Sequence, residues 1–188
     1  MTADSNFTSF SDLFKLGREV LKTETFVLHE GQTRATPSKK ALVKCLFIFG
    51  LTNEERAQVG EDIRTFRKAK HPCILALQDV IMEPEDRFCY LIYEHMPGGS
   101  LTDLLGTGRQ FTEGEVKTMV HRVLMALEAL HSQGLFHGHV TPGRILFSSP
   151  SNTEEAAGTA KLCYLEKVTR SMDDWQGTGG TTTDKDFR

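Results

Sequence analysis

The feature that most constrains the fold of this chain is the run from Ala41 to Phe49 (ALVKCLFIF), in which Lys44 is the only charged residue. A short, nearly continuous apolar run is typical of a strand that is buried on both faces of its sheet. A lysine inside such a run must extend to the surface, meet an anion or serve a function, because burying an unpaired ammonium is costly. The run therefore predicts a central strand whose one charge marks a candidate site.

The two halves of the chain differ in their hydrophobic period. Before the break at Pro97, Gly98 and Gly99, the apolar segments read as strands around one helix, which a capping box opens at Thr52 and which we expect to end near Ala69. After the break, a second capping box at Thr112 opens the longest predicted helix, to about Ser132. The other predicted elements are strands at Thr25–Glu30, Ile74–Met82, Phe88–Glu94, Ile145–Phe147 and Ala160–Tyr164, and a helical turn at Ser100–Leu105. This order predicts an α+β fold in two parts.

Composition limits the classes of function. The 188 residues carry a formal net charge of −3, which gives no reason to expect nucleic acid or a membrane surface as a partner. The four cysteines (Cys45, Cys73, Cys89 and Cys163) have neither zinc-ligand spacing nor the spacing of a disulfide framework. The sequence shows no signal-peptide pattern and no apolar run of roughly 18 residues. We therefore expect a cytoplasmic protein with reduced thiols.

Five motifs, in order, resemble those of the protein kinase superfamily of Ser/Thr type: ALVKCL, HPCILAL, LIYEHMPGGSL, LHSQGLFHGHVTPGRILF and KLCYLEK. The resemblance runs from about Phe14 to the end of the chain. It implies a two-lobed fold, with an N-lobe made of a five-stranded antiparallel sheet and one helix, and a partial helical C-lobe. The implied division is an N-terminal extension (1–13), an N-lobe (14–94), a partial C-lobe (95–170) and a flexible remnant of the activation segment (171–188), in which the chain ends.

The resemblance also implies which positions would perform phosphoryl transfer, and their residues are replaced. The base position holds His139, and Thr141 stands where a lysine would contact the transferred phosphate. One metal-binding position holds Arg144, whose guanidinium has no acceptor and cannot ligate a cation. At the other metal-binding position, Tyr164 replaces a carboxylate. We therefore expect no catalytic residue, no metal ligand and no bound Mg²⁺.

Part of the nucleotide site is retained. By resemblance, Lys44 matches the nucleotide lysine, Asp62 the acid that pairs with it, Glu94 and Met96 the hinge, and Leu146 the apolar floor. We expect Lys44 and Asp62 to form an ion pair, and favour a structural role for it over a phosphate clamp.

Other nucleotide positions depart from the family. The three cradle glycines are replaced by Lys22, Glu24 and Val27, although the aromatic Phe26 between them survives. Glycine is needed there because only a bare backbone approaches the phosphates closely. In the adenine site, Leu42 replaces a small alanine, His29 aligns with a valine, and the bulky Tyr93 is the gatekeeper. We expect these side chains to fill the pocket.

The residues that pack the family's fold are kept. The apolar spine that joins the two lobes maps to Phe66, Leu77, His137 and Leu165. Because packing residues remain and reacting residues are replaced, the favoured hypothesis is a pseudokinase that binds or regulates a protein partner, such as an active kinase or a kinase substrate.

Two alternatives remain open. One is a weak or atypical protein kinase that binds ATP and phosphorylates Ser or Thr of proteins, and the other is a non-functional gene fragment. No cofactor is required under the favoured hypothesis. A middle case is nucleotide binding without catalysis, with Lys44 and the hinge as contacts for ATP. A further expectation is that the apolar stripe of the longest helix (Val116, Val120, Val123 and Leu127) is partly uncovered.

Overall fold

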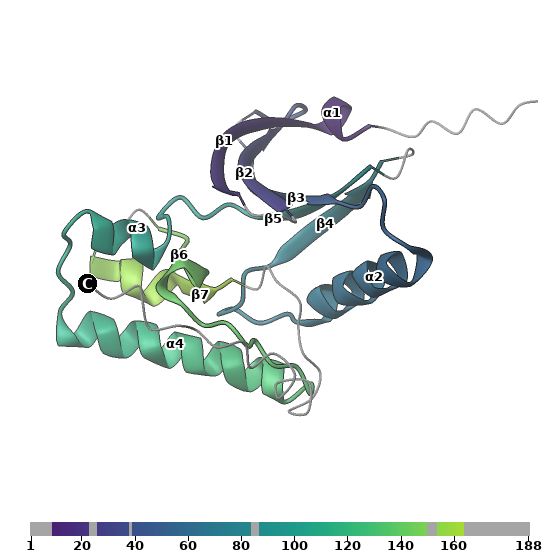
Figure 1. Ribbon diagram of the computed structural model, residues 1–188. Coiled ribbons are helices and arrows are strands. Elements are labelled where there is room, and N and C mark those ends of the chain that lie inside the picture. Colours follow the sequence, from purple (N-terminus) through teal and green to yellow (C-terminus); the bar gives the residue numbers. More distant parts are fainter. Residues whose placement is uncertain (1–8, 23–25, 38, 84–86, 150–153, 164–188) are drawn as a thin grey trace, which may run out of the picture.

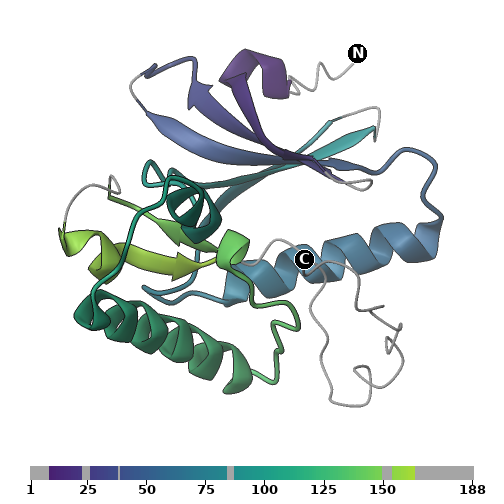
Figure 2. The ribbon, with the colours of Figure 1, turned by 60° about the vertical axis from the view of Figure 1, so that its left-hand side comes forward.

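The computed structural model describes residues 9–22, 26–37, 39–83, 87–149 and 154–163. Figures 1 and 2 both place a curved sheet at the top of the molecule, one long helix at the bottom and a short β-hairpin between them. The α+β fold expected from the sequence is confirmed: a sheet with one long helix comes first, and a mostly helical part follows.

The sheet is antiparallel, with strand order β1-β2-β3-β5-β4. Its strands are β1 (Phe14–Lys22), β2 (Phe26–Thr33), β3 (Lys40–Phe47), β4 (Leu77–Met82) and β5 (Phe88–Glu94). The central position of β3 explains its apolar run, because both of its faces are covered. β4 begins later than the sequence pattern suggests, since Ile74 forms an isolated parallel bridge with Leu162 instead of joining the sheet.

A short helix, α1 (Phe10–Leu13), covers the outer face of the sheet. The ring of Phe10 stacks on that of Tyr90, with 3.8 Å between the centroids. The two rings are buried together with Val43 and Ile92. The described end of the N-terminal extension is thus part of a core that sequence periodicity did not reveal.

The helix α2 (Asn53–Lys68) begins where its capping box predicts. The hydroxyl of Thr52 accepts a hydrogen bond from the backbone N–H of Glu55 at 3.2 Å, and the Glu55 carboxylate accepts one from the Thr52 N–H at 2.8 Å. These bonds satisfy backbone donors that a helix start leaves unpaired. In Figure 1, α2 lies beside β4.

The second part also agrees with the predicted elements. It contains α3 (Leu101–Gly106), α4 (Glu113–His131), the 3₁₀ turns η1 (Pro142–Arg144) and η2 (Glu154–Thr159), and the hairpin strands β6 (Ile145–Phe147) and β7 (Ala160–Leu162). η2 lies between the two hairpin strands, where the sequence predicted neither a helix nor a strand. On α4, Met119, Ala126 and Leu130 are buried, whereas Val116 and Val120 are exposed and Val123 and Leu127 are half-buried.

Backbone hydrogen bonds join the two parts. Leu162 in β7 donates to the carbonyl of Cys73 at 2.8 Å and accepts from Leu75 at 3.0 Å. Gly98 donates to the carbonyl of Phe147 at 2.9 Å. The segments on either side of β4 and β5 are thereby held against the β6–β7 hairpin, which fixes the floor of the site described next.

All four cysteines are buried free thiols. Burial raises the pKa of Cys45 to about 12 and that of Cys89 to about 11. Both thiols are therefore protonated at neutral pH and act as apolar core groups. None of the helices in the described part of the chain combines the length and the hydropathy needed to cross a bilayer.

Candidate functional site

The candidate site lies where the inner face of the sheet meets the β6–β7 hairpin. One buried apolar cluster spans this junction. Its members are Phe26, Leu28, Leu42, Leu75, Leu91, Tyr93, Met96, Leu146 and Cys163. Three residues predicted to line an adenine pocket (Leu42, Tyr93 and Leu146) are therefore packed into a common core.

Lys44 lies at the centre of this face. Its neighbours across the ladders are Leu28 on β2 and Leu91 on β5. The residue is only 4% exposed. Its ammonium lies 4.2 Å from the centroid of the Phe26 ring, within the range of a cation–π interaction. Burial makes this attraction stronger than it would be in water.

The expected ion pair between Lys44 and Asp62 is not formed between these two described residues. The Asp62 carboxylate instead accepts a hydrogen bond from the side-chain amide of Gln58, one turn earlier on α2, at 2.8 Å. Aspartate is one methylene shorter than glutamate, and the intrahelical bond holds its carboxylate near the α2 surface. The prediction of this pair was wrong.

The predicted position of His29 was also wrong. His29 pairs with Val43, on the outer face of the sheet, whereas Leu28 pairs with Lys44 on the inner face. Alternate residues of a strand point to opposite faces. Leu28, and not His29, therefore contributes to the site.

The link between β5 and α3 is held by an ion pair that the sequence did not predict. Lys161 in β7 donates to both carboxylate oxygens of Glu94, at 2.7 and 2.6 Å. The backbone N–H of Ala76 donates to the same carboxylate at 2.7 Å. Next to Glu94, burial and then the charge of Lys40 lower the pKa of His95. The lowered pKa favours the neutral imidazole.

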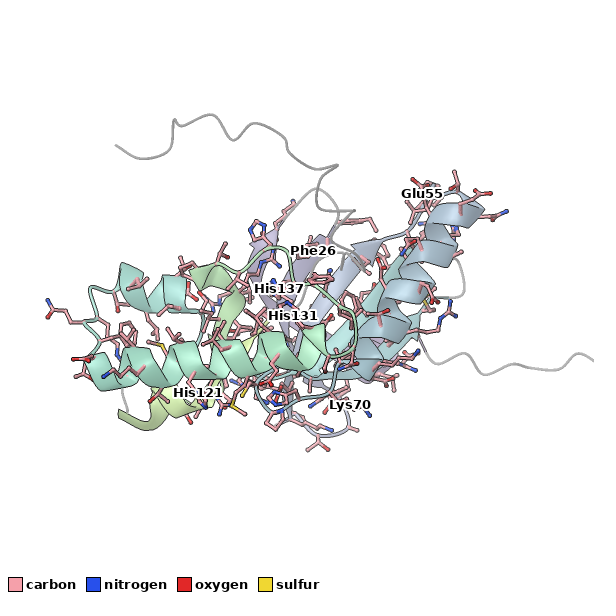
Figure 3. All side chains as sticks on the ribbon, turned by 90° about the horizontal axis from the view of Figure 1, so that it is seen from below. Phe26, Glu55, Lys70, His121, His131 and His137 are labelled. Carbon is pink, nitrogen blue, oxygen red and sulfur yellow. The ribbon has the colours of Figure 1, made fainter. Side chains whose placement is uncertain are left out.

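In the loop before β6, one histidine is buried and another is exposed to solvent. His137, labelled in Figure 3, is buried, and its Nε2 lies 3.0 Å from the carbonyl oxygen of Cys163. Its Nδ1 accepts a hydrogen bond from the backbone N–H of His139 at 3.2 Å, so Nε2 carries the proton and donates. The side chain of His139 is exposed. His137 is thus a structural link, and His139 lies at the surface.

Thr141 precedes the turn η1, and Arg144 ends it. Thr141 is the half-buried residue before it, and Arg144 is its buried last residue. The carbonyl of Arg144 accepts a hydrogen bond from the backbone N–H of Cys163 at 2.6 Å. Tyr164 and Leu165, which the sequence also singled out, lie outside the described residues.

A family model of the protein kinase domain matches residues 31–165. The chain belongs to the protein kinase family. The sheet with α2 is the kinase N-lobe, β5 leads into the hinge, and the part around α4 belongs to the C-lobe.

Curated kinases resemble the chain over much of its length. The MAP kinase-interacting serine/threonine-protein kinase 2 of Xenopus laevis is 29% identical over 166 residues, which are 87% of this chain and 34% of that protein. Human ribosomal protein S6 kinase alpha-2 is 34% identical over 119 residues, 63% of this chain and 16% of that kinase. Human calcium/calmodulin-dependent protein kinase type 1B is 34% identical over 108 residues, 57% of this chain and 31% of that kinase. The chain spans about a third or less of the length of these relatives.

Kinases use Mg²⁺ with ATP, and the residues at one metal-binding position do not fit this ion. Arg144 presents only donors and a positive charge there, so it repels a cation. Among the residues with described positions, no three His, Cys, Asp or Glu side chains converge as metal ligands would. The described residues around Arg144 therefore do not fit a bound Mg²⁺.

Two spine residues come together in the described structure. Phe66 is buried with Leu130 and Leu162, and Leu77 packs against the same cluster. The ion pair of Lys161 with Glu94 and the contact of Phe26 with Lys44 are the features that sequence reasoning missed. The only signal for the first was a lysine in the motif KLCYLEK, since its partner lies 67 residues earlier in the chain.

Proposed function

We propose that this chain is a kinase-like binding and regulatory module, a pseudokinase, that engages a protein partner and does not transfer phosphate. The observation that carries the proposal is the packing of the nucleotide cleft. Leu42 from β3, Tyr93 from β5 and Leu146 from β6 are all buried in one cluster, where a nucleotide base would have to displace them. The exposed His139 and the buried Arg144 at reacting positions support the same proposal.

A groove along α2 supports the binding part of the proposal. Its apolar lining comes from Ile48, Val59, Ile63, Val80 and Met82, and its volume is about 520 Å³. Arg56 and Arg67 also line it. A groove with an apolar floor and cationic margins suits a protein segment that presents apolar and acidic side chains.

Exposed aromatic and apolar side chains lie next to this groove. Phe49, in the link between β3 and α2, is 78% exposed, and Met82 on the groove wall is 51% exposed. Large apolar side chains that gather at the surface are typical of protein interaction sites. The proposed partner is an active protein kinase or a kinase substrate, and it docks on this groove.

A thermal-shift titration with ATP, with and without Mg²⁺, tests the non-catalytic part. We expect no rise in the melting temperature that depends on Mg²⁺, because Arg144 and Tyr164 stand at the two metal-binding positions. A Mg²⁺-dependent rise accompanied by incorporation of phosphate would support the atypical kinase instead and would overturn the proposal.

The binding part is tested by affinity capture from cell extract with matched variants. Val59→Glu places a charge in the groove, and Leu124→Glu places one on the exposed face of α4, away from the groove. A partner that wild type and Leu124→Glu retain, and that Val59→Glu loses, supports docking on α2. Equal recovery with all three proteins contradicts it.

A further inference from the structure

The contact between Phe26 and Lys44 lies in the part of the cleft where a nucleotide's phosphates would bind. Phe26 is the first residue of β2, and its ring is 2% exposed. Phe26 pairs with Leu46, and Leu28 pairs with Lys44, so both β2 side chains point to the face of the sheet that carries Lys44. The Phe26 ring therefore covers one side of the only charged group in the centre of β3.

We propose that Phe26 is an internal plug of the nucleotide cleft, which occupies a face of the Lys44 ammonium and competes with a nucleotide for it. A buried ammonium is attracted to an aromatic face, and this attraction grows when water is excluded. A phosphate that approached Lys44 from this side would first have to displace the ring. This inference rests on the proposed function in one respect, because both take this cleft to be the nucleotide cleft of the kinase family.

The pairing of β2 with β3 holds the plug in place. The register continues from Phe26 opposite Leu46 to Gln32 opposite Lys40 without a shift. No glycine lies between Gly17 and Gly31, so the start of β2 lacks the backbone freedom of a glycine-rich loop. The ring has apolar neighbours in the same cluster, including Leu28 and Leu42. The pairing of β2 with β3 therefore fixes the position of the Phe26 ring.

The test measures the affinity for a fluorescent ATP analogue, N-methylanthraniloyl-ATP, with and without Mg²⁺. We expect Phe26→Ala to bind it at least ten times more tightly than wild type. The double variant Phe26→Ala with Lys44→Ala is expected to lose this gain and to bind within about twofold of wild type, because the gain requires the Lys44 ammonium. Far-ultraviolet circular dichroism checks that each variant is folded.

The matched control is Phe88→Ala. Phe88 is an aromatic residue of the same sheet, but it packs on the outer face with Tyr90 and Ile92. This variant is expected to bind the analogue as wild type does. If Phe26→Ala does not fold, Phe26→Leu keeps most of the apolar volume without the π-face and is expected to bind about three times more tightly than wild type.

Equal affinities of wild type and the Phe26 variants, including no binding by any of them, would overturn the plug. A gain that survives Lys44→Ala would also overturn it. These results are distinguishable from a failure of the proposed function, which is read from phosphate incorporation by the unmodified chain.

Discussion

The ammonium of Lys161 in β7 bridges both carboxylate oxygens of Glu94 at the end of β5, at distances of 2.7 and 2.6 Å. The two side chains are 18% and 21% exposed, so the pair is largely shielded from water. Glu94 also accepts the backbone N–H of Ala76, and its own N–H donates to the Ala76 carbonyl at 3.1 Å. One carboxylate thus ties the hinge to the segment before β4 and to the C-lobe hairpin.

A double-mutant cycle with Lys161→Met and Glu94→Gln is expected to show a coupling free energy of about 1 kcal/mol, because the pair is shielded and has two charge-assisted bonds. Urea unfolding of the four proteins measures it. The control is Arg18 with Glu30, whose side chains are 74% and 41% exposed. We expect that cycle to give about 0.3 kcal/mol or less. Equal couplings would show that the hinge pair has no special role.

Gly98 lies where the hinge turn meets the end of β6. A Cβ atom there would overlap the carbonyl oxygen of Ser149 and lie 2.6 Å from the Cβ of Phe147. Gly98→Ala is therefore expected to lower the free energy of unfolding by more than about 2 kcal/mol, because backbone has to move. Gly60→Ala on α2 is the control, since a Cβ there meets nothing within 4 Å. It is expected to stabilise the chain by about 0.5–1 kcal/mol, and a loss at Gly60 as large as at Gly98 would contradict this account.

The capping box of α3 predicts a pH dependence. The hydroxyl and then the backbone N–H of Ser100 lower the pKa of Asp103 below its ordinary value of 3.8. Because the pKa of Asp103 is lower in the folded state, its ionised carboxylate stabilises the fold above pH 3.8. This stabilisation is lost as the pH falls toward the pKa of the folded state. Asp103→Asn is expected to cost about 0.5 kcal/mol at pH 7, a small figure because the carboxylate is mostly exposed to solvent.

Urea unfolding of wild type and Asp103→Asn at pH 7 and at pH 3 measures this effect. The difference between the two proteins should shrink at pH 3, because the stabilisation from ionised Asp103 is lost as the pH falls below 3.8 toward the lowered pKa of the folded state. A difference that stays constant or grows at pH 3 would show that ionisation of Asp103 contributes nothing to the cap.

The two faces of α4 are expected to respond differently to truncation. Leu130 is fully buried against α2 residues such as Phe66, and Leu124 is 57% exposed. Leu130→Ala is expected to cost about 3 kcal/mol through lost contacts and a cavity, whereas Leu124→Ala costs less than about 0.5 kcal/mol. Chemical unfolding at two protein concentrations measures both variants. A concentration-dependent cost at Leu124 would mean that a second copy covers that face.

Much of the fold was predictable from local signals. The capping boxes at Thr52 and Thr112 gave the starts of α2 and α4, and the apolar run around Lys44 gave the central strand. These signals are local because a cap and its helix, or a strand and its hydrophobic pattern, lie within a few residues of one another. By contrast, α1 has four residues and depends on stacking with Tyr90, which no local pattern encodes.

The site was less predictable because its contacts depend on register and on distant parts of the chain. Placing His29 in the cleft was an error of one residue, and a slip of one residue in a strand moves a side chain to the opposite face. The pair of Lys161 with Glu94 depends on how the two lobes meet. The position of Phe26 against Lys44 depends on the pairing of β2 with β3, which the residue types alone do not determine.

The central claim is that this chain does not transfer phosphate, and a transfer assay with γ-labelled ATP and Mg²⁺ tests it most directly. The full chain is incubated with a generic protein substrate, and Lys44→Met serves as the matched control because it removes the retained nucleotide lysine. We predict that wild type incorporates no more label than Lys44→Met, in itself or in the substrate. Incorporation by wild type that Lys44→Met abolishes would contradict the account and establish an atypical kinase.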